Sequence, residues 1–167
     1  VNVYNGETVN INNISLVNAY GYGIECIDSS TCNLDYTNIQ YNGQAGVRIG
    51  NNSISNINHS NISNNSSNGI LITDSNVIIE NTIIDSNTHE SGAGGGIYAS
   101  ISNISIDQST ISNNSAYTKG GGIYYWEGLG LEITNTMIRD NQALGTHGGG
   151  LYVAYSPGSI NINHCSF

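Results

Sequence analysis

Apolar and polar positions along this chain recur in a fixed order with a period of 22 to 28 residues. Each period contains a glycine followed by an apolar–any–apolar triplet, and six copies of this motif occupy residues 23–26, 46–49, 69–72, 96–99, 122–125 and 150–153. A period of this size is typical of repeat proteins, in which one structural unit stacks on the next. The repeat is therefore the main guide to the fold.

In each period three further apolar positions precede or follow the triplet. The residues at one such position in successive periods are called a column here. The first contains Val9, Cys32, Ser55, Val77, Ile104, Leu131 and Ile160, and the second contains Ile11, Leu34, Ile57, Ile79, Ile106, Ile133 and Ile162. The third, called the anchor column here, contains Leu16, Ile39, Ile62, Ile84, Ile111, Ile138 and Phe167. Apolar residues alternate with polar ones, which predicts strands with one buried face. We expect an all-β parallel β-helix (a solenoid) of about six to seven coils, with three short strands per coil.

An asparagine follows the anchor residue by three positions in five of the six complete periods. These residues are Asn42, Asn65, Asn87, Asn114 and Asn141. Stacked asparagines can donate from each carboxamide to the carboxamide oxygen of a neighbour. We expect them to form an asparagine ladder inside the solenoid or at one of its corners.

The chain begins and ends part-way through a coil, and neither end shows a cap. We expect residues 1–167 to form a single β-helix domain. Two alternatives stay open: the sequence is a segment of a longer β-helix, or it is a subunit that stacks head to tail into a filament.

Composition narrows the possible partners. The chain has 3 Lys+Arg against 12 Asp+Glu, a net charge of −9, which argues against binding nucleic acid or an anionic membrane surface. It has no apolar run long enough for a transmembrane segment. Its three cysteines lack the spacing of a zinc site, and we expect no cofactor or metal.

The cysteines and the asparagines point weakly to an oxidising, extracellular compartment. Cys26 and Cys32 flank a predicted turn, where they form either a disulfide or two small buried thiols. Eight Asn-x-Ser/Thr sequons are present, and the repeat frame places those at Asn58, Asn64 and Asn113 on the outside. If the source organism glycosylates secreted proteins, these three are the candidate sites.

The outward residue of the triplet forms a further column, which ends in three tyrosines. Tyr98, Tyr124 and Tyr152 come from consecutive coils, and Trp126 lies near them. An exposed aromatic strip can bind a glycan or a second copy of the chain. The alternative is an aromatic ladder that only stabilises the sheet.

One pair of acids has the arrangement that a glycosidase would need. Glu80 and Asp107 occupy the same outward column on adjacent coils, and a retaining hydrolase requires two carboxyl groups about 5 Å apart. The alternative is a solvated surface pair. We expect no catalytic activity, and we keep these two residues as weak candidates.

The motifs at residues 94–98, 120–124 and 148–152, Gly-Gly-Gly-Ile/Leu-Tyr with Ile-x-x-Asn upstream, resemble the polymorphic outer membrane protein repeat. That repeat pairs a Gly-Gly-Ala-Ile type motif with Phe-x-x-Asn on right-handed β-helices. The resemblance covers residues 84–153, with glycine in place of alanine and isoleucine in place of phenylalanine. It implies a secreted or surface-displayed structural protein: a fibre subunit, spacer rod or adhesin. Right-handed β-helices also include pectate lyases and polygalacturonases, so a polysaccharide-degrading enzyme is the alternative.

Overall fold

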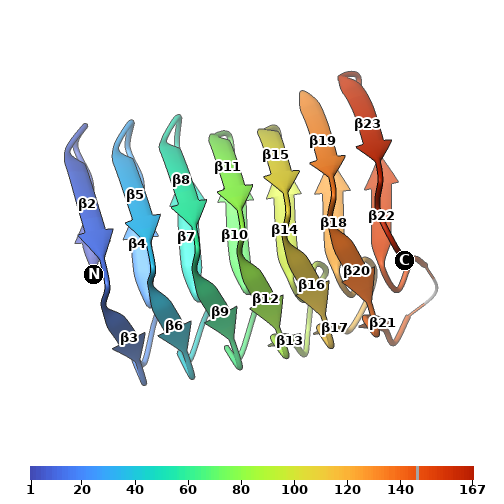
Figure 1. Cartoon of the computed structure of the whole chain (residues 1–167), viewed down its shortest axis with the longest axis horizontal. Coiled ribbons are helices and arrows are strands. Elements are labelled where there is room, and N and C mark those ends of the chain that lie inside the picture. Colours follow the sequence, from blue (N-terminus) through green and yellow to red (C-terminus); the bar gives the residue numbers. More distant parts are fainter. Residues whose placement is uncertain (146) are drawn as a thin grey trace.

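The computed structural model describes residues 1–145 and 147–167, and these form a solenoid of parallel strands (Figure 1). Each coil lies beside the next along the long axis of the molecule, so that the two termini lie at opposite ends. The described residues include no helix, and therefore none that could cross a membrane. The prediction of an all-β parallel solenoid is confirmed.

Three long sheets run the length of the solenoid. Sheet A contains β1 (Asn2–Val3), β4 (Ile24–Cys26), β7 (Val47–Gly50), β10 (Ile70–Thr73), β14 (Ile97–Ser100), β18 (Ile123–Trp126) and β22 (Leu151–Ala154). Sheet B contains β2 (Thr8–Asn12), β5 (Thr31–Asp35), β8 (Ile54–Asn58), β11 (Asn76–Glu80), β15 (Asn103–Asp107), β19 (Gly130–Thr134) and β23 (Ser159–Asn163). Sheet C contains β3 (Ser15–Val17), β6 (Asn38–Gln40), β9 (Asn61–Ser63), β12 (Ile83–Asp85), β16 (Thr110–Ser112) and β20 (Met137–Arg139).

A fourth sheet occupies the longer connections of the later coils. It contains β13 (Thr88–His89), β17 (Ser115–Ala116) and β21 (Gln142–Ala143), which pair in parallel. The three coils concerned thus have a fourth short strand in addition to the three that the sequence predicts. Two-residue strands carry no detectable alternation, so the repeat pattern could not reveal them.

The register of the strands follows the apolar columns of the sequence. Ile79 pairs with Ile57 on one side and with Ile106 on the other, and Ile106 pairs in turn with Ile133. All four side chains are at most 1% exposed. Burying such rows of aliphatic side chains is the main stabilising term of the solenoid, because no single coil could bury its apolar face alone.

The predicted asparagine residues form a continuous hydrogen-bonded row beside sheet C. Each carboxamide Nδ2 donates to the Oδ1 of the next asparagine: Asn42 to Asn65 at 2.9 Å, Asn65 to Asn87 at 2.8 Å, Asn87 to Asn114 at 3.0 Å and Asn114 to Asn141 at 3.0 Å. The same nitrogens also donate to anchor-column carbonyls one coil back, such as that of Ile62 for Asn87 at 3.0 Å. These buried polar groups are therefore satisfied along the axis.

Serine and threonine make two further buried rows. In each row the backbone N–H of one residue donates to the hydroxyl oxygen of the equivalent residue in the next coil. The rows are Ser30–Ser53–Ser75–Ser102 and Thr37–Ser60–Thr82–Ser109–Thr136. All nine residues are at most 4% exposed. The corners of the coils are thus held by hydroxyl groups as well as by carboxamides.

Candidate functional site

The outer face of sheet A carries the three tyrosines in one row. Tyr98, Tyr124 and Tyr152 are register partners on β14, β18 and β22. Their ring centroids are 5.2 Å apart for Tyr98 and Tyr124 and 5.5 Å apart for Tyr124 and Tyr152. The ring planes differ by 25° and 2°, so the rings stack along the solenoid axis.

Stacking covers the faces of these rings. Tyr124, in the middle, is only 9% exposed. Burial raises the pKa of its phenol, and the neighbouring Tyr98, Tyr152 and Glu127 raise it further by disfavouring a second negative charge. The row therefore offers ring edges and hydroxyl groups to a partner, and its geometry is that of a cross-strand aromatic ladder.

Two residues of the connecting loops contact Tyr152. The Lys119 Nζ lies 4.9 Å from the centroid of the Tyr152 ring and 3.4 Å from its hydroxyl oxygen. The His147 ring packs edge-on against Tyr152 at 5.7 Å. Sequence reasoning missed these contacts, because the loop conformation that brings them about is not encoded in the repeat.

Trp126 and Tyr155 form the more accessible aromatic pair. Trp126 is partly exposed: it is the register partner of Ser100 and Ala154, and its ring stacks on Tyr124 at a centroid distance of 6.1 Å. Tyr155 is 75% exposed and packs edge-on against Trp126 at a centroid distance of 4.6 Å. Among the aromatic groups on this face, this pair, called the Trp126–Tyr155 pair below, presents the most open apolar surface.

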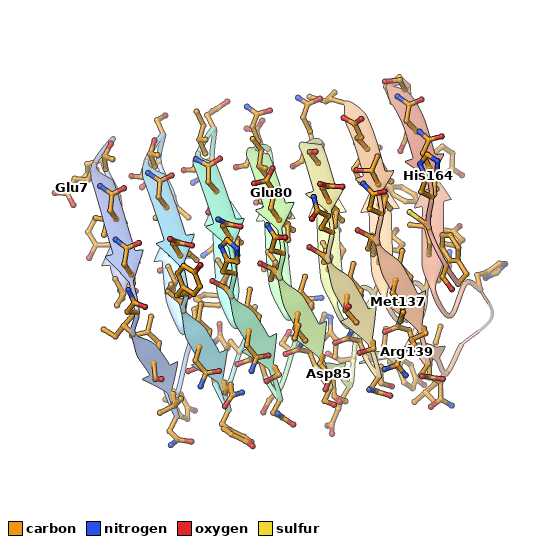
Figure 2. All side chains as sticks on the ribbon, in the orientation of Figure 1. Glu7, Glu80, Asp85, Met137, Arg139 and His164 are labelled. Atoms are coloured by element: carbon orange, nitrogen blue, oxygen red, sulfur yellow. A yellow bond between two sulfur atoms is a disulfide. The ribbon has the colours of Figure 1, made fainter. Side chains whose placement is uncertain are left out.

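The two candidate acids lie side by side on sheet B. Glu80 on β11 is the register partner of Asp107 on β15. Figure 2 shows Glu80 projecting outward from its strand, whereas the labelled Asp85 lies on β12 of the neighbouring sheet C. The register thus places one strand spacing, roughly 4.8 Å, between the two backbones.

Three side-chain hydrogen bonds engage the carboxylate of Asp107. It accepts from Thr134 Oγ1 at 2.6 Å, Asn135 Nδ2 at 2.8 Å and Gln108 Nε2 at 2.9 Å. These bonds, that from Thr134 above all, lower the pKa of Asp107 below its ordinary value of 3.8. The hydrogen bonds therefore favour the ionised form of Asp107.

Asp85 repeats this arrangement on sheet C. Burial alone would raise the pKa of Asp85, but the hydrogen bonds from Ser112, Asn113 and Ser86, together with the charge of Arg139, outweigh that effect and lower it. Carboxylates at strand ends thus serve as acceptors between coils.

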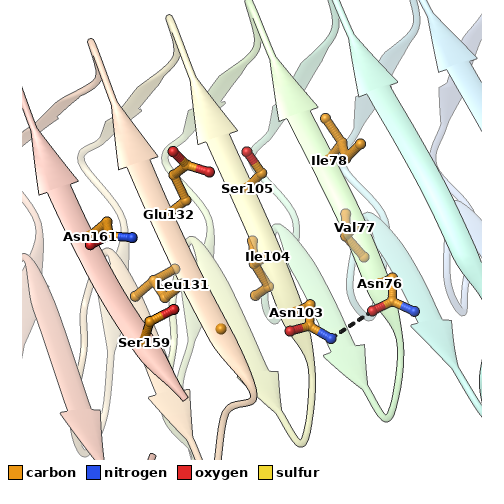
Figure 3. A pocket seen from close by; sticks show the side chains of 11 residues that line it. Asn76, Val77, Ile78, Asn103, Ile104, Ser105, Leu131, Glu132, Ser159 and Asn161 are labelled. Atoms are coloured by element: carbon orange, nitrogen blue, oxygen red, sulfur yellow. Dashed lines mark hydrogen bonds between the residues drawn. The ribbon is translucent and has the colours of Figure 1, made fainter.

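Sheet B also carries a shallow depression of about 290 Å³ on its outer face (Figure 3). Four consecutive strands, β11, β15, β19 and β23, contribute to it. Ser105, Glu132 and Asn161 line it from adjacent strands, and Ile78 closes one side. The sequence analysis did not find the depression. Neither Glu80 nor Asp107 is among its lining residues.

A comparison with protein families matches residues 1–167 to the family described as right handed beta helix region. The chain belongs to this right-handed β-helix family. Searches of curated proteins and of solved structures each found no match. The family match confirms the fold and its hand over the whole chain, and it leaves the choice between a structural and an enzymatic role open.

The three candidate glycosylation residues differ in their surroundings on the β-helix. Asn64 is exposed at a corner with a φ of 55°. Asn113 is also exposed, but its Nδ2 donates to Asp85 Oδ1 at 2.8 Å. Asn58 is half-buried and accepts from Asn81 Nδ2 at 3.2 Å. Asn64 is thus the most open of the three, and their modification stays a prediction.

The cysteines of the β-helix fall into two groups. Cys26 and Cys32, both fully buried, form a disulfide across the turn between β4 and β5. Cys165 is a half-buried free thiol near the C-terminal end. Within residues 1–145 and 147–167, no group of three or more His, Cys, Asp or Glu side chains could hold a metal ion.

Proposed function

We propose that this β-helix is a non-catalytic, extracellular protein with a structural or adhesive role, as a fibre subunit, a spacer rod or a surface adhesin. The observation that carries the proposal is the engagement of the Asp107 carboxylate by hydrogen bonds from Thr134 and Asn135 of the next coil and from Gln108. A glycosidase needs one carboxyl of its pair protonated to act as general acid. Ionised Asp107 could serve such a pair only as the nucleophile, and its bonds from Thr134 and Asn135 hold this carboxylate between two coils instead.

The extracellular placement rests on chemistry rather than on a targeting signal. The Cys26–Cys32 disulfide is of a kind that persists in oxidising compartments. The exposed sequon at Asn64 fits the same environment. We also propose surface display on the strength of the resemblance of residues 84–153 to the polymorphic outer membrane protein repeat.

The glycines of that resemblance have a packing role here. A Cβ atom on Gly95 would lie 2.4 Å from the carbonyl oxygen of Ser115, and one on Gly121 would lie 2.4 Å from the backbone of Gln142. Close approach of backbone segments requires glycine at both positions. The motif therefore builds the coil, which supports a structural role.

The Trp126–Tyr155 pair is the proposed contact with surface glycans. Tyr155 is 75% exposed and Trp126 is partly exposed, and aromatic rings of this kind can stack on the apolar face of a sugar ring. Self-association, including head-to-tail stacking, is the other partner that we propose. The net charge of −9 disfavours nucleic acid as a partner.

A polysaccharide-degrading activity is the second candidate, and one observation favours it. Glu80 and Asp107 are register partners, so their spacing falls near the separation of about 5 Å that retaining enzymes use. In such an enzyme Asp107 would be the nucleophile and Glu80 the acid.

Retention on immobilised polysaccharides tests the adhesive role. We expect Trp126→Ala and, separately, Tyr155→Asn to reduce retention by about tenfold or more, because each removes part of the exposed pair. Tyr41→Asn is the matched control, since Tyr41 is another exposed tyrosine at a corner with positive φ. Equal retention of all three variants would reject the Trp126–Tyr155 pair as the contact.

A further inference from the structure

One outward column of sheet B changes character half-way along the solenoid. In the first coils it contains asparagines that bind one another: Asn33 Nδ2 donates to Asn10 Oδ1 at 2.8 Å, and Asn56 Nδ2 donates to Asn33 Oδ1 at 2.7 Å. In register with these residues, the column continues as Ile78, Ser105, Glu132 and Asn161. The row of asparagines that hydrogen-bond to one another therefore ends at Ile78.

Beyond Ile78, the polar side chains of this column have unused hydrogen-bonding capacity. No hydrogen bond from another residue of the described chain engages the side chains of Ser105, Glu132 or Asn161. In the neighbouring column, Gly130 contributes no side chain, and both Ser105 and Gly130 line the depression. Unused donors and acceptors thus line this depression, whereas the asparagines of the first coils in the same column bond one another.

The floor and rim of the depression are fixed by contacts beneath and beside it. The backbone N–H of Gly130 donates to the hydroxyl of the buried Tyr125 at 2.9 Å, and that hydroxyl donates to the carbonyl of Ser102 at 2.8 Å. At the rim, Asn103 Nδ2 donates to Asn76 Oδ1 at 2.9 Å, which turns the Asn103 Oδ1 toward Gly130. A preformed site loses less conformational entropy when a ligand binds.

The chemistry of the lining matches a pyranose ring. Ile78, which is 44% exposed, offers an apolar wall for the C–H face of a sugar, while hydroxyl, carboxamide and carboxylate groups face its hydroxyl edge. The volume of about 290 Å³ lies just below the usual range of ligand sites, which suits a short stretch of a glycan.

Charge decides between classes of glycan. Glu132 lines the depression, and Glu80 and Asp107 lie on the same outer face. With a net charge of −9 on the chain, a uronate would be repelled, whereas a neutral sugar can donate hydroxyl hydrogens to the carboxylate.

We propose that the depression over Ser105 and Gly130 binds a pyranose unit of a neutral polysaccharide. This inference rests on the proposed adhesive function and names the class of its ligand and a second contact besides the Trp126–Tyr155 pair.

Affinity electrophoresis tests the proposal with a soluble neutral β-glucan, a neutral mannan and polygalacturonate as probes. We expect the β-helix to be retarded by a neutral polysaccharide and not by polygalacturonate. Ser105→Leu fills the depression and should weaken the apparent affinity about tenfold or more. Glu132→Gln should leave neutral binding within about threefold, because the amide still accepts a hydroxyl hydrogen, and should reduce the discrimination against polygalacturonate.

Matched controls separate binding from folding. Ser15→Leu makes the same change at an exposed outward position of β3 on sheet C and should leave the affinity unchanged. Circular dichroism establishes that each variant keeps its strands.

The outcomes distinguish this inference from the function on which it rests. Neutral binding that Ser105→Leu abolishes supports both. Binding that Ser105→Leu leaves unchanged, retardation by polygalacturonate alone, or no retardation by either neutral probe overturns the inference and leaves a structural role standing. Shortened polysaccharide in the gel would overturn the non-catalytic function itself.

Discussion

Asn87 leaves no room for a side chain on Gly69. A Cβ atom on Gly69 would lie 2.7 Å from Asn87 Nδ2, 2.7 Å from the carbonyl oxygen of Gly96 and 2.8 Å from Ile84 Cγ2. The repeated glycine and the repeated asparagine therefore depend on each other, because the row of carboxamides packs directly against the row of glycines. The same contact recurs between Gly46 and Asn65 at 2.8 Å and between Gly122 and Asn141 at 2.9 Å.

Gly69→Ala should therefore destabilise the β-helix by about 3 kcal/mol, because the methyl group would displace a backbone carbonyl or a buried carboxamide. Urea unfolding measures the change. Gly21→Ala is the control, since a Cβ atom on Gly21 has nothing within 4 Å, and it should change the stability by no more than about 1 kcal/mol. Equal effects of the two substitutions would contradict the packing argument.

Asn87→Ala should cost about 2–4 kcal/mol, because the buried Asn87 carboxamide accepts from Asn65 and donates to Asn114 and Ile62. Asn56→Ala removes a comparable carboxamide bond from the exposed row, where water can replace it, and should cost less than about 1 kcal/mol. Unfolding curves of both variants make the comparison. A larger loss for Asn56→Ala would show that burial is not what gives the inner row its strength.

The stability of the protein should fall in acid in a way that depends on Asp107. Its folded-state pKa is lowered below 3.8, so its contribution is fully present above the unfolded pKa and is lost as the pH falls through the folded pKa. Thr134→Val removes the hydrogen bond with the largest effect and should move the pKa of Asp107 upward. Carbon-detected NMR titration of the carboxyl group measures this pKa.

Thr73→Val, a matched substitution on the outer face of sheet A, should leave the titration of Asp107 unchanged. The account of the carboxylate fails if Asp107 of the wild-type protein titrates above 3.8, or if Thr134→Val does not shift it.

Reduction of the Cys26–Cys32 disulfide should lower the free energy of unfolding by about 2–3 kcal/mol, because the bond closes a short loop in the unfolded chain. The unfolding midpoint of the wild-type protein should therefore drop when a reductant is added. The double variant Cys26→Ala/Cys32→Ala should not respond to the reductant, whereas Cys165→Ala should respond as the wild type does. A wild-type midpoint that is insensitive to reductant would argue that the two sulfurs are unbonded in solution.

The backbone of the solenoid could be predicted because its determinants are local and periodic. The columns through Ile79 and Ile106 align in the sequence as they pair in the structure. The asparagine row could be predicted for the same reason, since each asparagine from Asn42 to Asn141 follows its anchor residue by three positions.

The buried hydroxyl rows were missed although their spacing is visible in the sequence. The sequence analysis did not single out Ser53 and Ser75, because serine is common on surfaces and nothing in its chemistry marks it as buried. These serines are buried because the coils stack closely and each backbone N–H donates to the hydroxyl of the next coil, as Ser53 does to Ser75.

The surface features depend on side-chain orientation, which the pattern does not determine. The sequence aligned Tyr98 with Tyr124 but could not show that their faces cover each other. Likewise, the order Asn56, Ile78, Ser105 was readable, yet a depression became recognisable only once neighbouring columns were placed beside it. The tyrosine row is thus a weaker candidate for glycan binding than its spacing indicates.

The central claim is that this β-helix can hold a polysaccharide without cutting it. Size-exclusion chromatography with light scattering, applied to a neutral polysaccharide recovered after prolonged contact with the protein, measures this directly. We predict an unchanged chain length for the wild-type protein, for Glu80→Gln and for Asp107→Asn alike. Shortening by the wild-type protein that either substitution abolishes would contradict the claim and would identify Glu80 and Asp107 as catalytic.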